Sequence, residues 1–216
     1  MILDSSKNLG GIGAILIIIG ALAFFVQPLF TLGFCFLGAI LMLFALRGLA
    51  DYYKEKGIFN NGLYGFIALI GGSIVTYAGF FYLVFYTSDV TNLVSKLYPG
   101  FNGDWSTLPN LTANTNLNPT EIVPFISPIL AVLVVAWIFI IITTFFTWRS
   151  IKNLSSKSQV GLFSTAGLLL LVGAIIPLLG LVLMWIALLL AAIAFFQIKP
   201  QPEQSAATIS FPPPTV

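Results

Sequence analysis

The stretch that decides the fold is residues 8–46, NLGGIGAILIIIGALAFFVQPLFTLGFCFLGAILMLFAL. It carries no charged residue, and it is almost twice as long as the roughly 20 apolar residues that one helix needs to cross a bilayer. Gln27-Pro28 lies near its middle, where proline removes a helical hydrogen-bond donor and favours a turn. The stretch therefore predicts a helical hairpin inside a membrane.

The rest of the chain repeats this separation of charge from apolar sequence. The chain is 58% hydrophobic and only 7% charged, with a mean hydropathy of +1.02. A soluble domain carries roughly a quarter of charged residues. A second charge-free run, 158–198, is also long enough for two helices and has Pro177 and Gly180 near its middle, whereas residues 57–88 and 122–148 each suffice for one helix.

We therefore predict an all-α polytopic integral membrane protein with about six transmembrane helices, in the order hairpin, single, single, hairpin. Helices are expected because open strand edges leave unpaired backbone groups in lipid. The predicted spans are 9–27, 29–48, 63–86, 122–148, 161–178 and 180–198, within a single helical domain over 1–199. The other interpretation of each long run is one kinked helix followed by an interfacial segment. A cleaved signal peptide ending at Ala21-Leu22-Ala23 is disfavoured, since the apolar stretch continues through Val26.

The basic residues predict the orientation. With a cytoplasmic N-terminus, eight of the nine Lys and Arg residues fall inside and only Lys96 falls outside. Positive charge near span ends sets orientation, so both termini are expected to be cytoplasmic. The inner basic segments suit anionic lipid head groups. The net charge is only +2 and no basic stripe is present, so we expect membrane lipid, and not nucleic acid, as a partner.

The segments between the spans carry four further predictions. In the external loop, 87–121, the apolar spacing of Val90, Leu93, Val94 and Leu97 predicts a short surface helix. Asn110, in the triplet Asn110-Leu111-Thr112, is a potential glycosylation site. Residues 51–56 are expected to extend the second helix until Gly57 and Asn60-Asn61-Gly62 break it. The tail, 200–216, is Pro-rich and is expected to be extended on the cytoplasmic side.

Small residues predict where the helices pack. In lipid, helices approach closely where their side chains are small. The span 63–86 places five such residues, three or four positions apart, on one stripe: Gly65, Ala68, Gly72, Thr76 and Gly79. Similar pairs seven apart are Gly13 with Gly20, Gly38 with Ala45, and Ala187 with Ala194. Tight packing is the favoured interpretation, and a small-residue ligand cavity is the other. A parallel internal repeat of the two hairpins is a further hypothesis.

Groups that carry chemistry are scarce. The chain has no histidine and one cysteine, Cys35, within the second predicted span. None of the seven carboxylates lies inside a predicted span, where proton relays and ion sites need them. We therefore predict no catalytic, cofactor-binding or metal site, and no enzyme activity. Asp51 and Glu55 beside Lys54 and Lys56 suit a phosphate or head group, but a solvated helix extension is the favoured interpretation.

Most of the chain resembles a known family, and the external loop resembles it least. The segments ALRGLADYYK (45–54) and GIFNNGLYG (57–65) resemble the signature of an uncharacterised, mainly archaeal multi-spanning membrane protein family, domain of unknown function 996. Thr165-Ala166-Gly167 and the ending Ile193-Ala194-Phe195-Phe196 are similar to it too. The resemblance implies an archaeal cell membrane and a six-span fold, and it implies no reaction. The cytoplasmic zinc-binding tail of some members does not carry over, because no cysteine or histidine follows Cys35.

Three functions remain in competition. The favoured one is a non-enzymatic accessory or scaffold subunit that packs against other membrane proteins or itself. The alternative is a channel or carrier for a neutral or apolar solute, with a path lined by Ser73, Thr76, Tyr77, Thr143 and Thr144. The third is a lipid-modifying enzyme, which would need Asp51, Glu55 and the inner lysines to converge at the level of the head groups.

Overall fold

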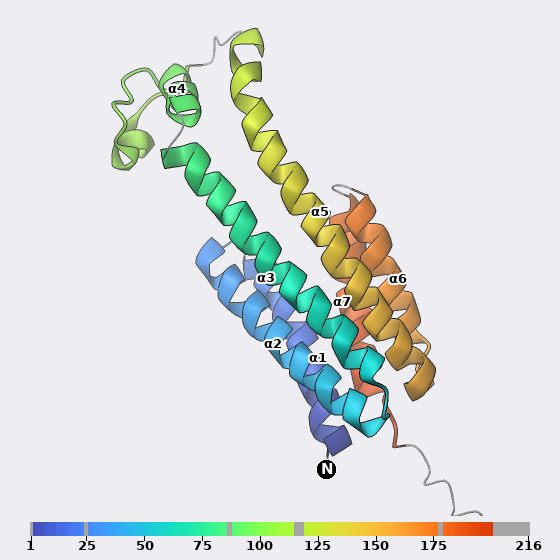
Figure 1. Cartoon of the computed structure of the whole chain (residues 1–216). Coiled ribbons are helices and arrows are strands. Elements are labelled where there is room, and N and C mark those ends of the chain that lie inside the picture. Colours follow the sequence, from blue (N-terminus) through green and yellow to red (C-terminus); the bar gives the residue numbers. More distant parts are fainter. Residues whose placement is uncertain (1, 24–25, 86–87, 115–118, 177–178, 201–216) are drawn as a thin grey trace, which may run out of the picture. The chain divides into compact units, whose positions relative to one another are not determined.

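All regular secondary structure is helical in the residues that the computed structural model describes, which are 2–23, 26–85, 88–114, 119–176 and 179–200 (Figure 1). No strand occurs in these ranges. The elements are α1 (Ile2–Ala23), α2 (Pro28–Tyr52), α3 (Lys56–Phe85), α4 (Ser88–Leu97), the 3-10 helix η1 (Trp105–Asn110), α5 (Pro119–Ser158), α6 (Leu162–Ile175) and α7 (Leu179–Phe196).

Five of these helices contain a segment that is long and apolar enough to cross a membrane. The segments are Leu3–Ala23, Phe30–Tyr52, Lys56–Val84, Ile126–Ser158 and Leu179–Phe196. The sixth apolar helix, α6, has 14 residues and at 1.5 Å per residue is shorter than the roughly 30 Å of a bilayer core. Thus the structure supports an all-helical membrane protein, with five full-length candidates where six spans were expected. The longest helix, α5, has 40 residues and extends beyond the predicted 122–148 at both ends.

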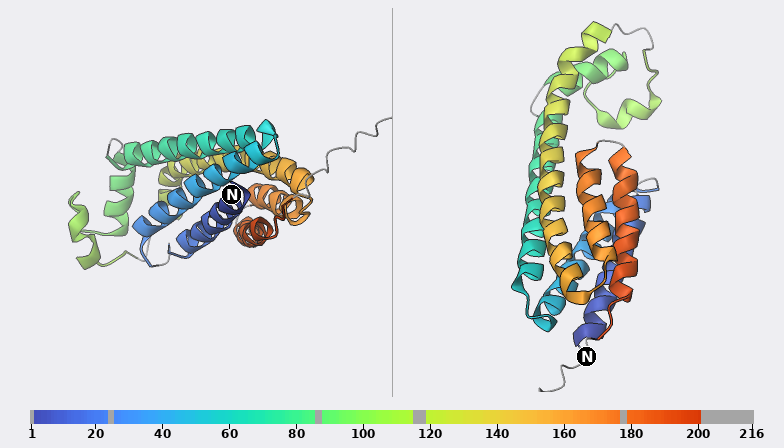
Figure 2. Two further views of the ribbon diagram at one scale, coloured as in Figure 1. Left: turned by 90° about the horizontal axis from the view of Figure 1, so that it is seen from below. Right: turned by 90° about the vertical axis from the view of Figure 1, so that its right-hand side faces the viewer.

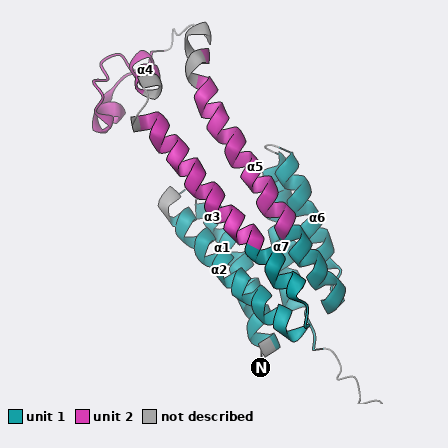
Figure 3. Cartoon of the chain, viewed as in Figure 1, with its two compact units in different colours: residues 1–63, 147–216 teal, residues 64–146 magenta. Residues whose placement is uncertain are grey.

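The described residues group into two compact units, shown in Figure 3. Unit 1 comprises residues 1–63 and 147–216, and unit 2 comprises residues 64–146. The helices α3 and α5 contribute residues to both units. The single domain expected over 1–199 stays a prediction, and each unit is described by itself below.

Unit 1 contains both expected hairpins. Its α1 ends at Ala23, whose carbonyl accepts hydrogen bonds from the N–H groups of Val26 (3.0 Å) and Gln27 (2.8 Å). The next helix, α2, begins at Pro28. Proline is tolerated there because an N–H in the first turn has no acceptor within the helix. The turn predicted at Gln27-Pro28 is therefore confirmed, and α1 packs against α2. The second hairpin is formed by α6 against α7, and α1 also packs on α7; Pro177 lies outside the described residues.

A buried apolar cluster of unit 1 joins α2, α3, α5, α6 and α7. Phe163 and Phe195 meet edge to face, with ring centroids 5.0 Å apart and planes at 80°. Both rings are fully buried together with Leu49, Ile58 and Leu154. Such interlocked side chains hold the helix ends and their connections in one arrangement.

The connection between α2 and α3 differs from the sequence prediction. Tyr53 is the C-cap of α2, and the Glu55 N–H donates to the Ala50 carbonyl at 2.9 Å, the pattern of a Schellman turn. The helix predicted to continue through Lys56 stops here instead. Asn60-Asn61-Gly62, predicted to be a break, lies inside α3. The Asn61 side-chain amide stabilises the start of α3 by donating to the Gly57 carbonyl at 2.7 Å.

Lys54 occupies the left-handed position of this turn, with φ +52°. A lysine there costs about 1 kcal/mol relative to glycine, which has no Cβ to clash. We expect Lys54→Gly to stabilise the protein by about 1 kcal/mol, measured by unfolding in detergent micelles titrated with SDS. Lys56→Gly, at the first residue of α3, serves as the control for loss of charge and should give no gain. A loss of stability in Lys54→Gly would contradict the strained turn.

Unit 2 is built on an antiparallel pair of helix segments from α3 and α5. The Tyr64 ring lies 5.6 Å from the Phe146 ring near one end of the pair. Further along, Gly72 faces Phe139 and Gly79 faces Val132, so a step of seven on one helix matches a step of seven on the other. This is the spacing of left-handed helix packing.

The remaining elements of unit 2 are α4 and η1. The helix predicted from the apolar spacing in 87–121 is confirmed as α4, where Leu93, Val94 and Leu97 are half-buried and Lys96 is exposed. The side chain of Val90 lies outside the described part. Asp104 caps η1 by accepting from the N–H (2.9 Å) and the hydroxyl (2.7 Å) of Ser106, and these bonds hold the pKa of its carboxyl below the usual range.

Candidate functional site

The charged groups of unit 1 gather at one of its ends, which we call the charged end. Figures 1 and 2 show that the start of α1, the α2–α3 connection, the α5–α6 connection and the end of α7 all lie there. Eight of the nine Lys and Arg residues belong to these segments: Lys7, Arg47, Lys54, Lys56, Arg149, Lys152, Lys157 and Lys199. Lys96 belongs to unit 2.

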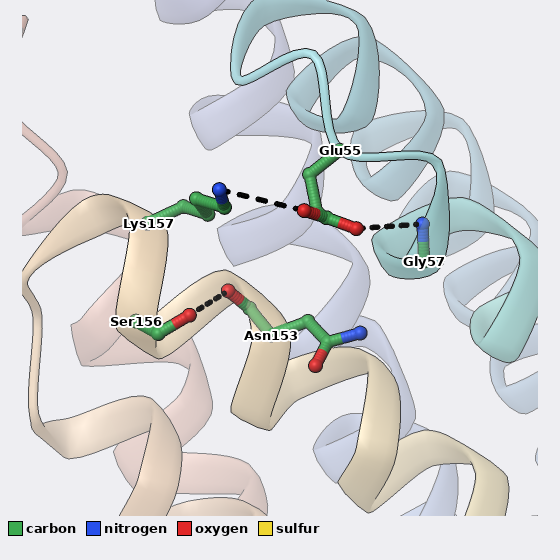
Figure 4. Close-up of polar contacts among 5 residues, drawn as sticks. All are labelled: Glu55, Gly57, Asn153, Ser156 and Lys157. Atoms are coloured by element: carbon green, nitrogen blue, oxygen red, sulfur yellow. Dashed lines mark hydrogen bonds and ion pairs between the residues drawn. The ribbon is translucent and has the colours of Figure 1, made fainter.

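A polar clamp joins the α2–α3 connection to the end of α5 (Figure 4). One carboxylate oxygen of Glu55 lies 3.4 Å from the Lys157 ammonium, and the other accepts from the Gly57 N–H at 3.3 Å. The side chains are 35% and 46% exposed, so the ion pair contributes at most about 1 kcal/mol. Its role is to fix the position of the connection and to cap the first turn of α3.

Close packing completes the clamp. A Cβ built on Gly57 would lie 2.7 Å from the Asn153 amide nitrogen, so a larger residue here would displace the end of the Asn153 side chain. The Ser156 hydroxyl donates to the Asn153 carbonyl at 2.9 Å (Figure 4). One helical turn earlier on α5, the buried Ser150 hydroxyl donates to the Ile58 carbonyl at 2.5 Å. Sequence reasoning missed Ser150, because a lone serine beside Arg149 resembles an ordinary solvated residue.

Asp51 and Glu55 do not lie one turn apart on a continuous helix. The Schellman turn separates the two, leaving Asp51 exposed at the end of α2 while Glu55 turns to Lys157 and Gly57. Two basic residues of this end lie over aromatic rings instead. The Lys152 ammonium is 5.1 Å from the Trp148 ring, and the Arg47 guanidinium is 6.0 Å from the Phe59 ring.

Tyr53 adds a buried polar group to the charged end. Its side chain is 9% exposed, and its hydroxyl has no hydrogen-bond partner among the described residues. Burial, with a smaller contribution from Tyr52, raises the pKa of Tyr53 to about 12. The sequence does not indicate that Tyr53 is buried, because either tyrosine of the pair Tyr52-Tyr53 could equally well lie at the membrane interface.

The buried hydroxyl makes a testable prediction. An unsatisfied buried hydroxyl costs about 1 kcal/mol or more, so we expect Tyr53→Phe to raise the free energy of unfolding by about 1 kcal/mol at pH 7. Because the folded pKa is raised above the unfolded value of about 10, the wild type should lose stability as the pH rises from 10 to 12. The variant should lose less over that range. Unfolding titrations at pH 7, 10 and 11.5 check this, and equal alkaline losses would contradict it.

The predicted packing stripe lies in unit 2. Gly65 and Gly72 are buried, Ala68, Thr76 and Gly79 are half-buried, and the intervening Ile67, Ile74 and Tyr77 are exposed. The structure thus brings Gly72 and Gly79 onto the face of α3 that meets α5. Asn110, the predicted glycosylation site, is exposed at the last residue of η1, and its modification stays a prediction.

The contacts described above are ion pairs, hydrogen bonds and close packing between helices. Within the described part of the chain, no three His, Cys, Asp or Glu side chains lie close enough together to hold a metal ion. Comparison with known proteins finds no match among curated proteins or solved structures. One family does match, described as protein of unknown function (DUF996), over residues 34–189, which is well over half of the chain. The chain therefore belongs to the DUF996 family of proteins of unknown function.

Proposed function

We propose that this chain is a non-enzymatic accessory or scaffold subunit of a membrane protein complex. The observation that supports this is a second small-residue face on α3, beside the one that meets α5. A Cβ built on Gly71 meets no atom within 4 Å, whereas one on the neighbouring Gly72 meets Phe139. The open face also includes Ile67, Ile74 and Ala78, which are exposed.

The spacing of this open face suits a helix of a partner or of a second copy. Gly71 and Ala78 lie seven residues apart, and so do Ile67 and Ile74. Small residues at that spacing allow close approach of helix backbones, and large apolar side chains beside them fill the seam. The lack of histidine and the scarcity of carboxylates agree with a role that needs no catalysis.

We also infer that the charged end faces the cytoplasm of an archaeal cell membrane, with both termini on that side. The support is the concentration of eight basic residues on segments of unit 1 that meet at one end. The polar loop before α5 is then external, and Asn110 is exposed to the glycosylation machinery.

The channel or carrier alternative has less support. It needs polar groups that face a path, yet the Ser73 hydroxyl donates to the Leu69 carbonyl of its own helix at 2.8 Å. The Thr144 hydroxyl likewise shares its one hydrogen between the carbonyls of Ile140 (2.9 Å) and Ile141 (3.0 Å) on its own helix. Such bonds leave less capacity to replace the hydration of a solute. We therefore keep the scaffold role as the proposal.

Native mass spectrometry of the protein purified from its own membrane in a mild detergent tests the role. We expect a stoichiometric membrane-protein partner or a defined homo-oligomer, and we expect Gly71→Leu to lower its abundance about tenfold. The matched control is Gly33→Leu on α2, which also meets open space but has no small residue seven positions on. A clean monomer, or equal loss in both variants, would count against the proposal.

A further inference from the structure

A pocket of about 930 Å³ opens at the charged end of unit 1, and none of the clamp residues Glu55, Gly57, Asn153, Ser156 and Lys157 lines it. Three segments distant in the sequence form it: Lys7 on α1, residues 158–161 from the end of α5 to the start of α6, and residues 196–200 from the end of α7 onward. We propose that this pocket binds a phosphate-bearing anion, such as the head group of an anionic phospholipid. The proposal goes beyond the scaffold role and does not depend on any protein partner.

The charge of the lining favours an anion. Lys7 and Lys199 are its two ionised side chains, and no carboxylate lines it. Lys7 is also paired with Asp4 at 2.7 Å, but the Asp4 side chain is 67% exposed, so this pair is weak and an anion in the pocket competes with it. The amides of Gln159 and Gln197 add neutral hydrogen-bond donors to the two ammonium groups.

The apolar part of the lining favours an amphiphile over a bare ion. Val160, Phe196 and Ile198 line the pocket together with the lysines and glutamines. A phospholipid offers a phosphate for the lysines and a glycerol and acyl region for these side chains. The pocket is much larger than an inorganic phosphate, and it lies where the candidate span of α7 ends at Phe196, the depth at which head groups are found.

The test has two arms that separate the sources of phosphate, each using the full-length protein in dodecyl maltoside. In the first, native mass spectrometry counts phosphatidylglycerol retained per chain against phosphatidylcholine at equal concentration. In the second, thermal unfolding is followed with inorganic phosphate up to about 10 mM. Lys7→Gln/Lys199→Gln removes both pocket charges. Lys54→Gln/Lys56→Gln removes two exposed charges from the same end but outside the lining, as the control.

We expect one phosphatidylglycerol per chain, bound about tenfold more weakly by the pocket variant and unchanged in the control, since two partly exposed charged contacts together contribute about 1.4 kcal/mol. Saturable stabilisation by inorganic phosphate alone, lost in the pocket variant, would also support the anion site and would identify free phosphate as its source. No saturable binding in either arm, or equal weakening in both double variants, would overturn the proposal.

Discussion

Gly38→Ala is expected to destabilise the α1–α2 hairpin by about 2–3 kcal/mol, among the largest effects of any single methyl group in this chain. A Cβ on Gly38 would lie 2.6 Å from the Gly13 carbonyl oxygen and 3.0 Å from the Ile17 backbone nitrogen. A Cβ on Gly13 would in turn lie 2.7 Å from the Gly38 carbonyl oxygen. Because the opposing atoms belong to the backbone, no side-chain rotation relieves the clash and the two helices must separate.

The control for this variant lies on the same helix. Gly33→Ala adds the same methyl group where nothing lies within 4 Å, so it should be neutral or stabilising by up to about 1 kcal/mol through helix propensity. Unfolding in SDS-titrated micelles, followed by tryptophan fluorescence, measures both. Equal stabilities of the two variants would show that α1 and α2 do not meet at Gly13 and Gly38.

Gly72→Leu is the second large effect, with an expected loss of about 3 kcal/mol at the seam between α3 and α5 in unit 2. The new Cβ alone would lie 2.5 Å from the Phe139 Cβ and 2.7 Å from its Cγ. Those atoms are attached closely to the α5 backbone, so they cannot swing aside as the end of a long side chain does. The seam must open or the helices must shift.

The neighbouring glycine gives a stringent comparison for this result. Gly71→Leu introduces the same side chain into open space, so the stability of the monomer should change by less than about 1 kcal/mol. In the proposed scaffold role, the same variant weakens association with a partner. The pair therefore separates folding, which depends on Gly72, from assembly, which depends on Gly71. Similar losses of monomer stability in both would contradict the assignment of the two faces.

The sequence predicts the helices and the first hairpin well, for local reasons. Charged side chains are costly in lipid, so runs of sequence without charge indicate the apolar helices even when the fold is not known. Proline disrupts the helical turn that contains it, so the position of the connection between α1 and α2 could be predicted from Pro28 alone. The spacing of Gly72 and Gly79 likewise needs only helical geometry to put them on one face.

The connections and the charged end could not be predicted in the same way. The α2–α3 turn has lysine where a glycine would have signalled it, so Lys54 gave no warning. Asn61 and Gly62 resemble a break, but the Asn61 amide bonds to its own helix and Gly62 packs beside Leu46 and Ser150, contacts that only the fold reveals. Lys7 and Lys199 likewise meet around one pocket only because α1 packs on α7.

The central claim is a membrane-spanning helical protein whose charged end is cytoplasmic, and accessibility of single cysteines tests it most directly. In a Cys35→Ala background, Ala113→Cys places a thiol in the loop before α5, and Ser156→Cys places one at the charged end; both positions are exposed. Intact cells are treated with a membrane-impermeant maleimide. We predict labelling of Ala113→Cys in intact cells and of Ser156→Cys only after permeabilisation. Labelling of Ser156→Cys in intact cells, or of neither variant until lysis, would contradict the claim.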